Sequence, residues 1–163
     1  MVAIGEAPGA DEDRTGAPFT GAGGEYVRGL MRETLGTYYD QVFFTHLLGC
    51  RPPDNRDPLY HEIDACRPRL AALLKVLRPQ AVLIFGGKAM RAMTGKVNLA
   101  RRRGEKLTIK MTWKGEEFRV LAFVTHACVD LARIQDSSHR AEVLADIENA
   151  AIQAGFPLGA STG

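Results

Sequence analysis

The sequence lacks the marks of several large classes of protein. It has only three cysteines, an odd number that argues against a disulfide framework and fits a reducing cytoplasm. No apolar run approaches the ~20 residues that a membrane span needs. The apolar N-terminus, residues 1–4, runs straight into a glycine-rich loop, which leaves no room for a signal peptide. We therefore expect a cytoplasmic protein without membrane contact. Its 163 residues suffice for one globular domain.

Charge is nearly balanced along the whole chain but not locally. The net charge is +2, whereas residues 1–40 carry three basic and seven acidic side chains and residues 96–119 carry eight basic and three acidic ones. A basic surface beside an acidic pocket is typical of a protein that binds the phosphates of its ligand and catalyses a reaction at another group of that ligand.

Apolar runs alternate with helical periodicity. Buried strands are predicted at 2–4, 42–48 and 81–85, a hairpin at 107–113 and 118–126, and helices at 25–35, 60–77, up to 93 and at 140–154. The glycine-rich stretch 5–24 and the proline-rich stretch 50–58 are expected to be loops. This alternation predicts an α/β fold with a mostly parallel central sheet covered on both faces, that is, three α/β/α layers. We expect a single domain over residues 1–155 and a loose tail over 156–163.

Four loops follow the predicted parallel strands. They begin at Gly5, His46, Gly86 and His126. In open α/β sheets, ligands bind outside the carboxyl ends of the strands. The binding site is therefore expected among these four loops.

Five ordered segments resemble the motifs of the family 4 uracil-DNA glycosylases. The first is GEAPGADEDRTGAPFTGAGGEYV, which resembles that family's Gly-Glu-x-Pro-Gly and Gly-x-Pro-Phe-x-Gly motif. The others are VFFTHLLGCRPPDNRDP, LRPQAVLIFGGKAM, ARRRG and VTHACVDLA. The resemblance covers about residues 2–150. It implies a DNA glycosylase of the base excision repair type, which hydrolyses the N-glycosidic bond of uracil or a related modified pyrimidine.

The resemblance also implies a division of roles. A flipped base is held in a pocket, and charge develops on base and sugar as the bond breaks. Glu6 would position the water or stabilise the sugar cation, and His126 would donate to the base carbonyl. Phe19 would stack on the base, and the backbone amides at Glu6 and Ala7 would donate to it.

Further charged residues are expected around this pocket. Glu12 or Asp13 either supplies a second carboxylate behind the catalytic groups or is a solvated loop acid. Phosphate contacts are expected from a group of arginines, namely Arg51, Arg56, Arg101, Arg102 and Arg103, which together match the electrostatic footprint of a DNA-binding protein.

The first departure from the family pattern is His46, where the family has asparagine. An asparagine amide pairs with a uracil carbonyl and the adjacent ring N–H together, which one edge of a histidine ring cannot do. His46 is therefore expected to weaken uracil recognition or to fit a different base. Because histidine titrates near neutral pH, base preference is expected to depend on pH.

The second departure is the loop after His126. The family sequence His-Pro-x-Tyr-Leu-Leu-Arg reads here His-Ala-Cys-Val-Asp-Leu-Ala. Asp130 replaces an apolar residue, and Leu131 remains as the wedge into DNA. A negative charge beside DNA disfavours flipping from an intact duplex, so single strands are the expected substrate, bound by a monomer.

The third departure concerns metal. The family holds a [4Fe–4S] cluster on four cysteines. Cys50 and Cys66 match the second pair in place and spacing, whereas the first pair would lie upstream of the first strand. We expect no metal and no cofactor, with the two cysteines as a remnant. The alternative is that an upstream segment is missing.

Two other functions are consistent with the sequence. One is a catalytically weak module that uses the same pocket to hold a base or a DNA end, which His46 and the altered histidine loop favour. The other is hydrolysis of a free nucleoside or nucleotide. The basic stretch at 96–119 argues for a polymer instead.

Overall fold

The computed structural model describes residues 1–128, 130 and 137–158 and contains one five-stranded sheet. The strand order is β2-β1-β3-β5-β4. The strands are β1 (Val2–Gly5), β2 (Phe43–His46), β3 (Val82–Phe85), β4 (Leu107–Trp113) and β5 (Glu116–Thr125). Every neighbouring pair is parallel except β4 and β5, which form an antiparallel hairpin. This confirms the mostly parallel sheet.

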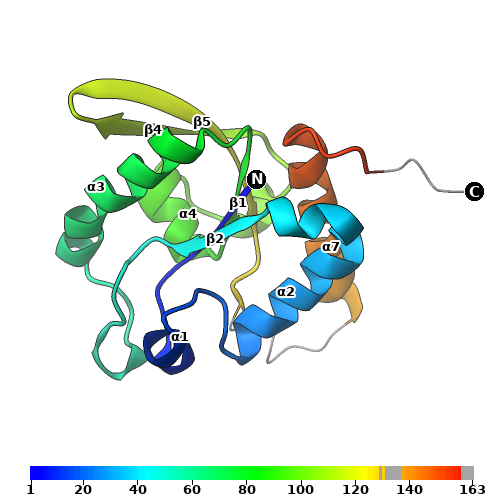
Figure 1. The fold of residues 1–163 in the computed structure, drawn as a ribbon, viewed down its shortest axis with the longest axis horizontal. Helices are drawn as coiled ribbons and strands as arrows, with labels where there is room; N and C mark the ends of the chain where they lie inside the picture. Colours follow the sequence, from blue (N-terminus) through cyan, green and yellow to red (C-terminus); the bar gives the residue numbers. More distant parts are fainter. Residues whose placement is uncertain (129, 131–136, 159–163) are drawn as a thin grey trace, which may run out of the picture.

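Helices cover both faces of this sheet (Figure 1). They are α1 (Ala10–Thr15), α2 (Ala22–Leu35), α3 (Tyr60–Leu77), α4 (Gly87–Thr94), α5 (Leu99–Arg102) and α7 (Ser137–Gln153), with 3-10 turns η1 (Gly36–Gln41) and η2 (Pro53–Asn55). Side chains alternate across each strand. In β1, Ile4 joins the core beneath α3 and α4, whereas Ala3 faces the core beneath α2 and α7. The three-layer α/β/α arrangement is confirmed.

Hydrophobic periodicity did not predict two short helices. α1 lies inside the predicted loop 5–24, and α5 lies in the basic stretch before the hairpin. Neither contains a buried residue, so neither has the apolar face that periodicity detects. By contrast, α3 begins and ends at the predicted residues.

The C-terminal part of the described chain is packed rather than loose. Phe156 is buried, and its ring stacks on Tyr38 with centroids 5.8 Å apart. The expectation of a loose tail from residue 156 is therefore corrected at its first residue. Residues 159–163 lie outside the described part.

Among the described residues, no helix is both long enough and apolar enough to cross a membrane.

Candidate functional site

A pocket of about 820 Å³ opens at the carboxyl edge of the parallel strands. The loops after β1, β2, β3 and β5 all contribute to its wall, as the sequence predicts. Glu6, Phe19, His46, Lys88 and Cys128 are among the residues that line it. The volume falls within the range of pockets that hold small organic ligands.

Glu6 is fixed in this wall through its backbone. The Leu48 amide donates to the Glu6 carbonyl at 3.1 Å, and the Leu47 amide donates to the Gly5 carbonyl at 2.8 Å. These bonds join the loop after β1 to the segment after β2. Burial raises the pKa of the Glu6 carboxyl, and the positive charge of Lys88 opposes that rise.

Phe19 lines the pocket and is only 1% exposed. Its edge-to-face contacts with Phe44 and Phe85 have centroid distances of 5.2 and 5.6 Å. Its backbone has a φ of 59°, and the Arg28 Nε donates to its carbonyl at 3.0 Å. A Cβ on Gly24 would lie 2.4 Å from the Phe19 backbone, so glycine is required there. The ring is thus held by Phe44 and Phe85, and its backbone by Arg28 and the close approach of Gly24.

His46 lies flat against Phe19. The two ring centroids are 5.1 Å apart and the planes differ by 14°, an offset stack. The ring also lies over Gly5, where an added Cβ would be 2.7 Å from the His46 Cδ2 atom. His46 therefore covers part of the aromatic surface on which a base is expected to stack.

The His46 ring is neutral at physiological pH. Burial lowers its pKa to about 4, against the opposing attraction of the Glu12 carboxylate. The expectation that this residue titrates near neutral pH is therefore wrong, because the desolvation cost of the imidazolium outweighs the nearby negative charge. Base preference is not expected to change between about pH 6 and 8 through His46.

Glu12 joins two loops of the pocket wall. Its carboxylate accepts hydrogen bonds from the Gly9 amide at 2.9 Å and the Gly21 amide at 2.8 Å. Burial opposes its ionisation, but these backbone donors prevail and lower the pKa of the carboxyl. Glu12 thereby holds the two loops that carry Glu6 and Phe19, whereas Asp13 is exposed.

His126 follows β5 and is turned towards α7. Its Nε2 lies 2.7 Å from Oε2 of Glu142. The neighbouring Ala127 and Cys128 line the pocket, but His126 itself is not among the lining residues. The predicted donation from His126 to a base requires its ring to leave Glu142 or to use the other nitrogen, so its role stays a prediction.

Two of the predicted phosphate-binding arginines lie beside the pocket in the loop after β2. Arg56 lines the pocket and donates to both carboxylate oxygens of Glu62, the shorter bond being 2.6 Å. Arg51 donates from Nε to Asn55 at 2.7 Å. Both side chains order this loop, and their contact with phosphate stays a prediction.

The other three arginines lie around α5 and differ from one another. Arg103 is 16% exposed and bonds to Glu142 at 2.5 Å and Asp146 at 2.8 Å, so it ties this segment to α7. That position argues against a phosphate contact by Arg103. Arg102 pairs with Glu105, whereas Arg101 is exposed. The predicted wedge at Leu131 lies outside the described residues.

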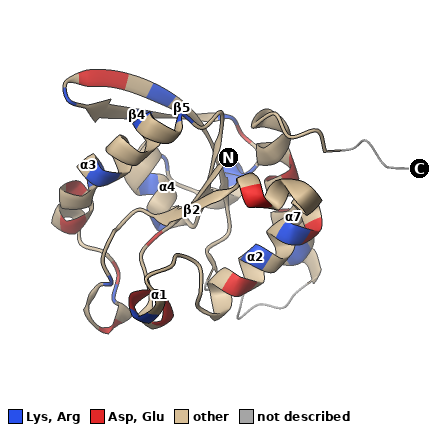
Figure 2. Ribbon diagram, viewed as in Figure 1, with Lys and Arg blue, Asp and Glu red and all other residues tan. Residues whose placement is uncertain are grey.

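The basic stretch 96–119 does not form one surface beside the pocket. Two adjacent glutamates interrupt the basic residues near the hairpin turn (Figure 2), and Glu116 pairs with Lys75 while Glu117 lies near Arg119. β5 has ten residues and runs towards the pocket, so the hairpin turn lies about 30 Å from the pocket edge. The expected basic surface beside the pocket is therefore limited to the residues around α5.

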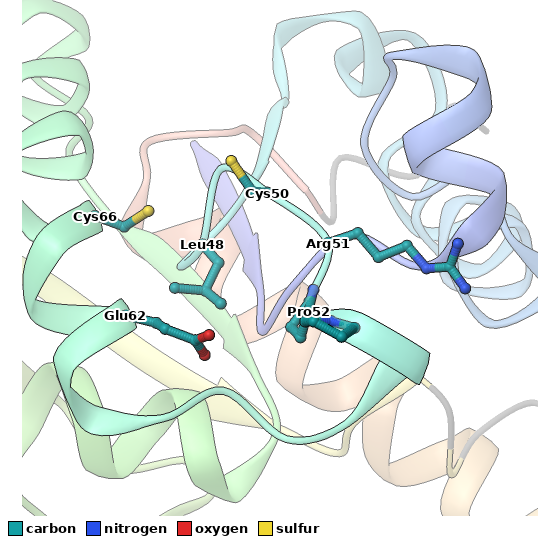
Figure 3. Close-up of a pocket in the computed structure, with 7 residues that line it drawn as sticks. Leu48, Cys50, Arg51, Pro52, Glu62 and Cys66 are labelled. Carbon is teal, nitrogen blue, oxygen red and sulfur yellow. The ribbon is translucent and has the colours of Figure 1, made fainter.

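Cys50 and Cys66 line a separate cavity of about 100 Å³. Figure 3 shows their sulfur atoms on the same side of it, with the Arg51 side chain directed away from them. The Gly49 amide donates to the Cys66 sulfur at 3.4 Å. A [4Fe–4S] cluster needs four thiolates, and these residues provide two. Cys128 is not a substitute, since it lines the larger pocket and burial raises the pKa of its thiol.

The fold and the pocket define a three-layer α/β/α protein with a buried aromatic ring and a carboxylate at one ligand site. The chain belongs to the uracil DNA glycosylase superfamily, whose profile matches residues 1–148.

Three relatives named type-4 uracil-DNA glycosylase illustrate this similarity. The chain is 35% identical to one from Sulfurisphaera tokodaii over 76% of this chain and 56% of the relative, and 38% identical to one from Saccharolobus solfataricus over 76% and 57%. It is 33% identical to one from Thermotoga maritima over 92% and 75%. The chain thus spans little more than half the length of the first two relatives.

Proposed function

We propose that the protein is a DNA glycosylase that hydrolyses the bond between a uracil-like base and its deoxyribose. The observation that carries this proposal is the meeting of Glu6 and Phe19 in one pocket at the carboxyl edge of the sheet. Membership of the superfamily and the names of the similar proteins support it.

The reaction needs negative charge near the sugar and donors near the base. As the C1′–N bond breaks, its electron pair leaves with the base and the sugar becomes cation-like. The Glu6 carboxylate stabilises that cation and orients a water, whose oxygen bonds to C1′ while its proton passes to the carboxylate. The base anion is stabilised by backbone amides at Glu6 and Ala7 and by His126, and then takes up a proton.

The substrate class is single-stranded DNA. Asp130 lines the pocket and lies close enough to Glu6 to act on it electrostatically. A carboxylate at this mouth repels the phosphates of a duplex pressed against it, whereas a single strand can approach with its base first. A base already unstacked also avoids the flipping cost of a few kcal/mol.

Base release from an oligonucleotide panel tests this function. The panel compares uracil, 5-hydroxymethyluracil, hypoxanthine and thymine in single and double strands, with abasic sites scored by alkaline cleavage. We expect release of at least one modified pyrimidine, faster from single strands. If no base is released while DNA is still bound, the proposed activity is wrong.

That negative result would favour a second candidate, a binding module on the same fold. The specific observation in its favour is the His46 ring, which lies on Phe19 where a base is expected to stack. Such a module would bind DNA with a salt-dependent affinity and release nothing.

Lys88 lines the pocket and lies in the segment LRPQAVLIFGGKAM, but the sequence alone indicates no role for it. It contacts the Asp57 carboxylate, and its charge lowers the pKa of Glu6, whereas Asp57 and Asp130 raise it. Because the reaction needs ionised Glu6, activity falls as the pH drops through the pKa of this carboxyl. Lys88→Met removes the lowering charge, so the acid limb of the pH–rate profile is expected to move to higher pH.

The expected effect is modest, because Lys88 is exposed and solvent screens its charge. At mildly acidic pH the Lys88→Met rate should be lower by a factor on the order of 2–5, which corresponds to about 1 kcal/mol or less. At neutral pH the difference should be smaller. Lys88→Arg, which keeps the charge, is the matched control. An unmoved acid limb in Lys88→Met would show that Lys88 does not act on Glu6.

A further inference from the structure

Three potential metal ligands meet where β5 ends and α7 begins. They are the imidazoles of His126 and His139 and the carboxylate of Glu142, whose ligand atoms all lie within 4.8 Å of one another. His139 and Glu142 are three residues apart on α7 and so share a face of the helix. His126 comes from the loop after β5 and faces them.

The Glu142 carboxylate of this cluster is held in place by neighbouring side chains. Both His126 Nε2 and Arg103 Nη1 contact Oε2 of Glu142, at 2.7 and 2.5 Å. Arg103 is in turn held by the buried Asp146 at 2.8 Å, which balances its charge. Hydrogen-bonded partners of this kind fix the carboxylates that ligate metals.

We propose that His126, His139 and Glu142 form a site for a divalent transition-metal ion, with Zn²⁺ the best match. Two imidazole nitrogens and one carboxylate oxygen are an established zinc donor set, with water in the fourth position. In a tetrahedral zinc site the ligand atoms lie about 3.3 Å apart, so His126 Nε2 and Glu142 Oε2 would separate slightly from 2.7 Å and the other spacings, at most 4.8 Å, would shorten through side-chain rotation. The ion would bind the neutral His126 ring through Nε2, in the tautomer that carries its proton on Nδ1.

Zinc at this site holds His126 turned towards α7, away from the pocket. The imidazole proposed to donate to the departing base would then be a metal ligand. Inhibition of base release by zinc therefore rests on the proposed function, whereas the binding of the ion does not. The two statements are tested separately.

Metal binding is measured first on the full chain after treatment with a chelator. Co²⁺ reports tetrahedral coordination through its visible absorption, and Zn²⁺ affinity follows from calorimetry or competition. His139→Ala and the isosteric Glu142→Gln are each expected to weaken Zn²⁺ binding at least ~10–100-fold. His61→Ala removes an exposed histidine on α3, and a Cys50→Ser, Cys66→Ser variant removes the two thiols near the separate cavity. Both controls should bind as the wild type does.

Each outcome decides the proposal. Absent binding in the wild type, unchanged binding in His139→Ala and Glu142→Gln, or loss of binding in the cysteine variant would overturn it. If His139→Ala does not fold, Glu142→Gln alone gives the answer. Zinc should then inhibit base release in the wild type but not in His139→Ala. Binding without inhibition keeps the metal site and removes the role of His126.

Discussion

Glu6→Gln is expected to abolish base release while DNA binding stays nearly unchanged. The glutamine has the same shape but carries no charge to stabilise the sugar cation and cannot accept the proton of the attacking water. Loss of a positioned acid–base group costs about 10²–10⁴-fold in rate. Binding should persist because the backbone bonds of Gly5 and Glu6 to Leu47 and Leu48 do not involve the side chain. Single-turnover base release and a salt-controlled binding titration measure the two quantities.

An exposed glutamate serves as the control for this change. Glu148 lies on α7 and is not among the residues that line the pocket. Glu148→Gln should leave both base release and binding unchanged. If Glu6→Gln is as active as the wild type, the proposed role of Glu6 is wrong. Loss of binding together with activity would mean that the carboxylate holds the pocket open rather than acting on the sugar.

Much of the fold follows from local pattern. The strands at 2–5 and 82–85 read directly from short apolar runs that end in glycine, because parallel strands are buried on both faces. The location of the pocket follows in turn, since the carboxyl ends of these strands share one edge. The pattern did not predict α1, which has no buried face and at whose start the Glu12 carboxylate accepts a hydrogen bond from the Gly9 amide.

The side-chain arrangement within the site could not be read in the same way. Glu6 and Phe19 both line the pocket, and their roles stay predictions. The rotation of His46 onto Phe19, however, depends on a ring that is supplied 27 residues earlier and on the space above Gly5. Likewise, His126 faces Glu142, which comes from another layer of the fold. Such contacts depend on packing between distant segments, which no local spacing encodes.

The same limit explains why the sequence assigned no role to Lys88 and Asp57, although both lie in segments that resemble the family motifs. They are 31 residues apart, and each alone is an ordinary surface charge. Only the folded chain brings the start of α4 beside the loop after β2. The pH dependence of the pocket is therefore a property of the fold rather than of any one motif.

His46→Asn is expected to increase uracil excision by roughly 5–150-fold, which corresponds to about 1–3 kcal/mol. Two effects contribute. The amide pairs with a uracil carbonyl and the adjacent N–H together, which the neutral imidazole cannot do. The smaller side chain also uncovers the face of Phe19 on which the His46 ring now lies. The measurement is kcat/KM for uracil against thymine in single-stranded oligonucleotides.

His46→Ala separates the two effects, because it uncovers Phe19 without supplying an amide. A gain confined to His46→Asn would assign base reading to the amide, whereas equal gains would assign it to the freed aromatic face. If neither variant gains activity and both melt at the temperature of the wild type, the base is read elsewhere in the pocket. Since burial keeps His46 neutral down to a pKa of about 4, the wild-type ratio of uracil to thymine should stay flat across neutral pH. A ratio that changed between about pH 6 and 8 would mean that a group other than His46 reads the base.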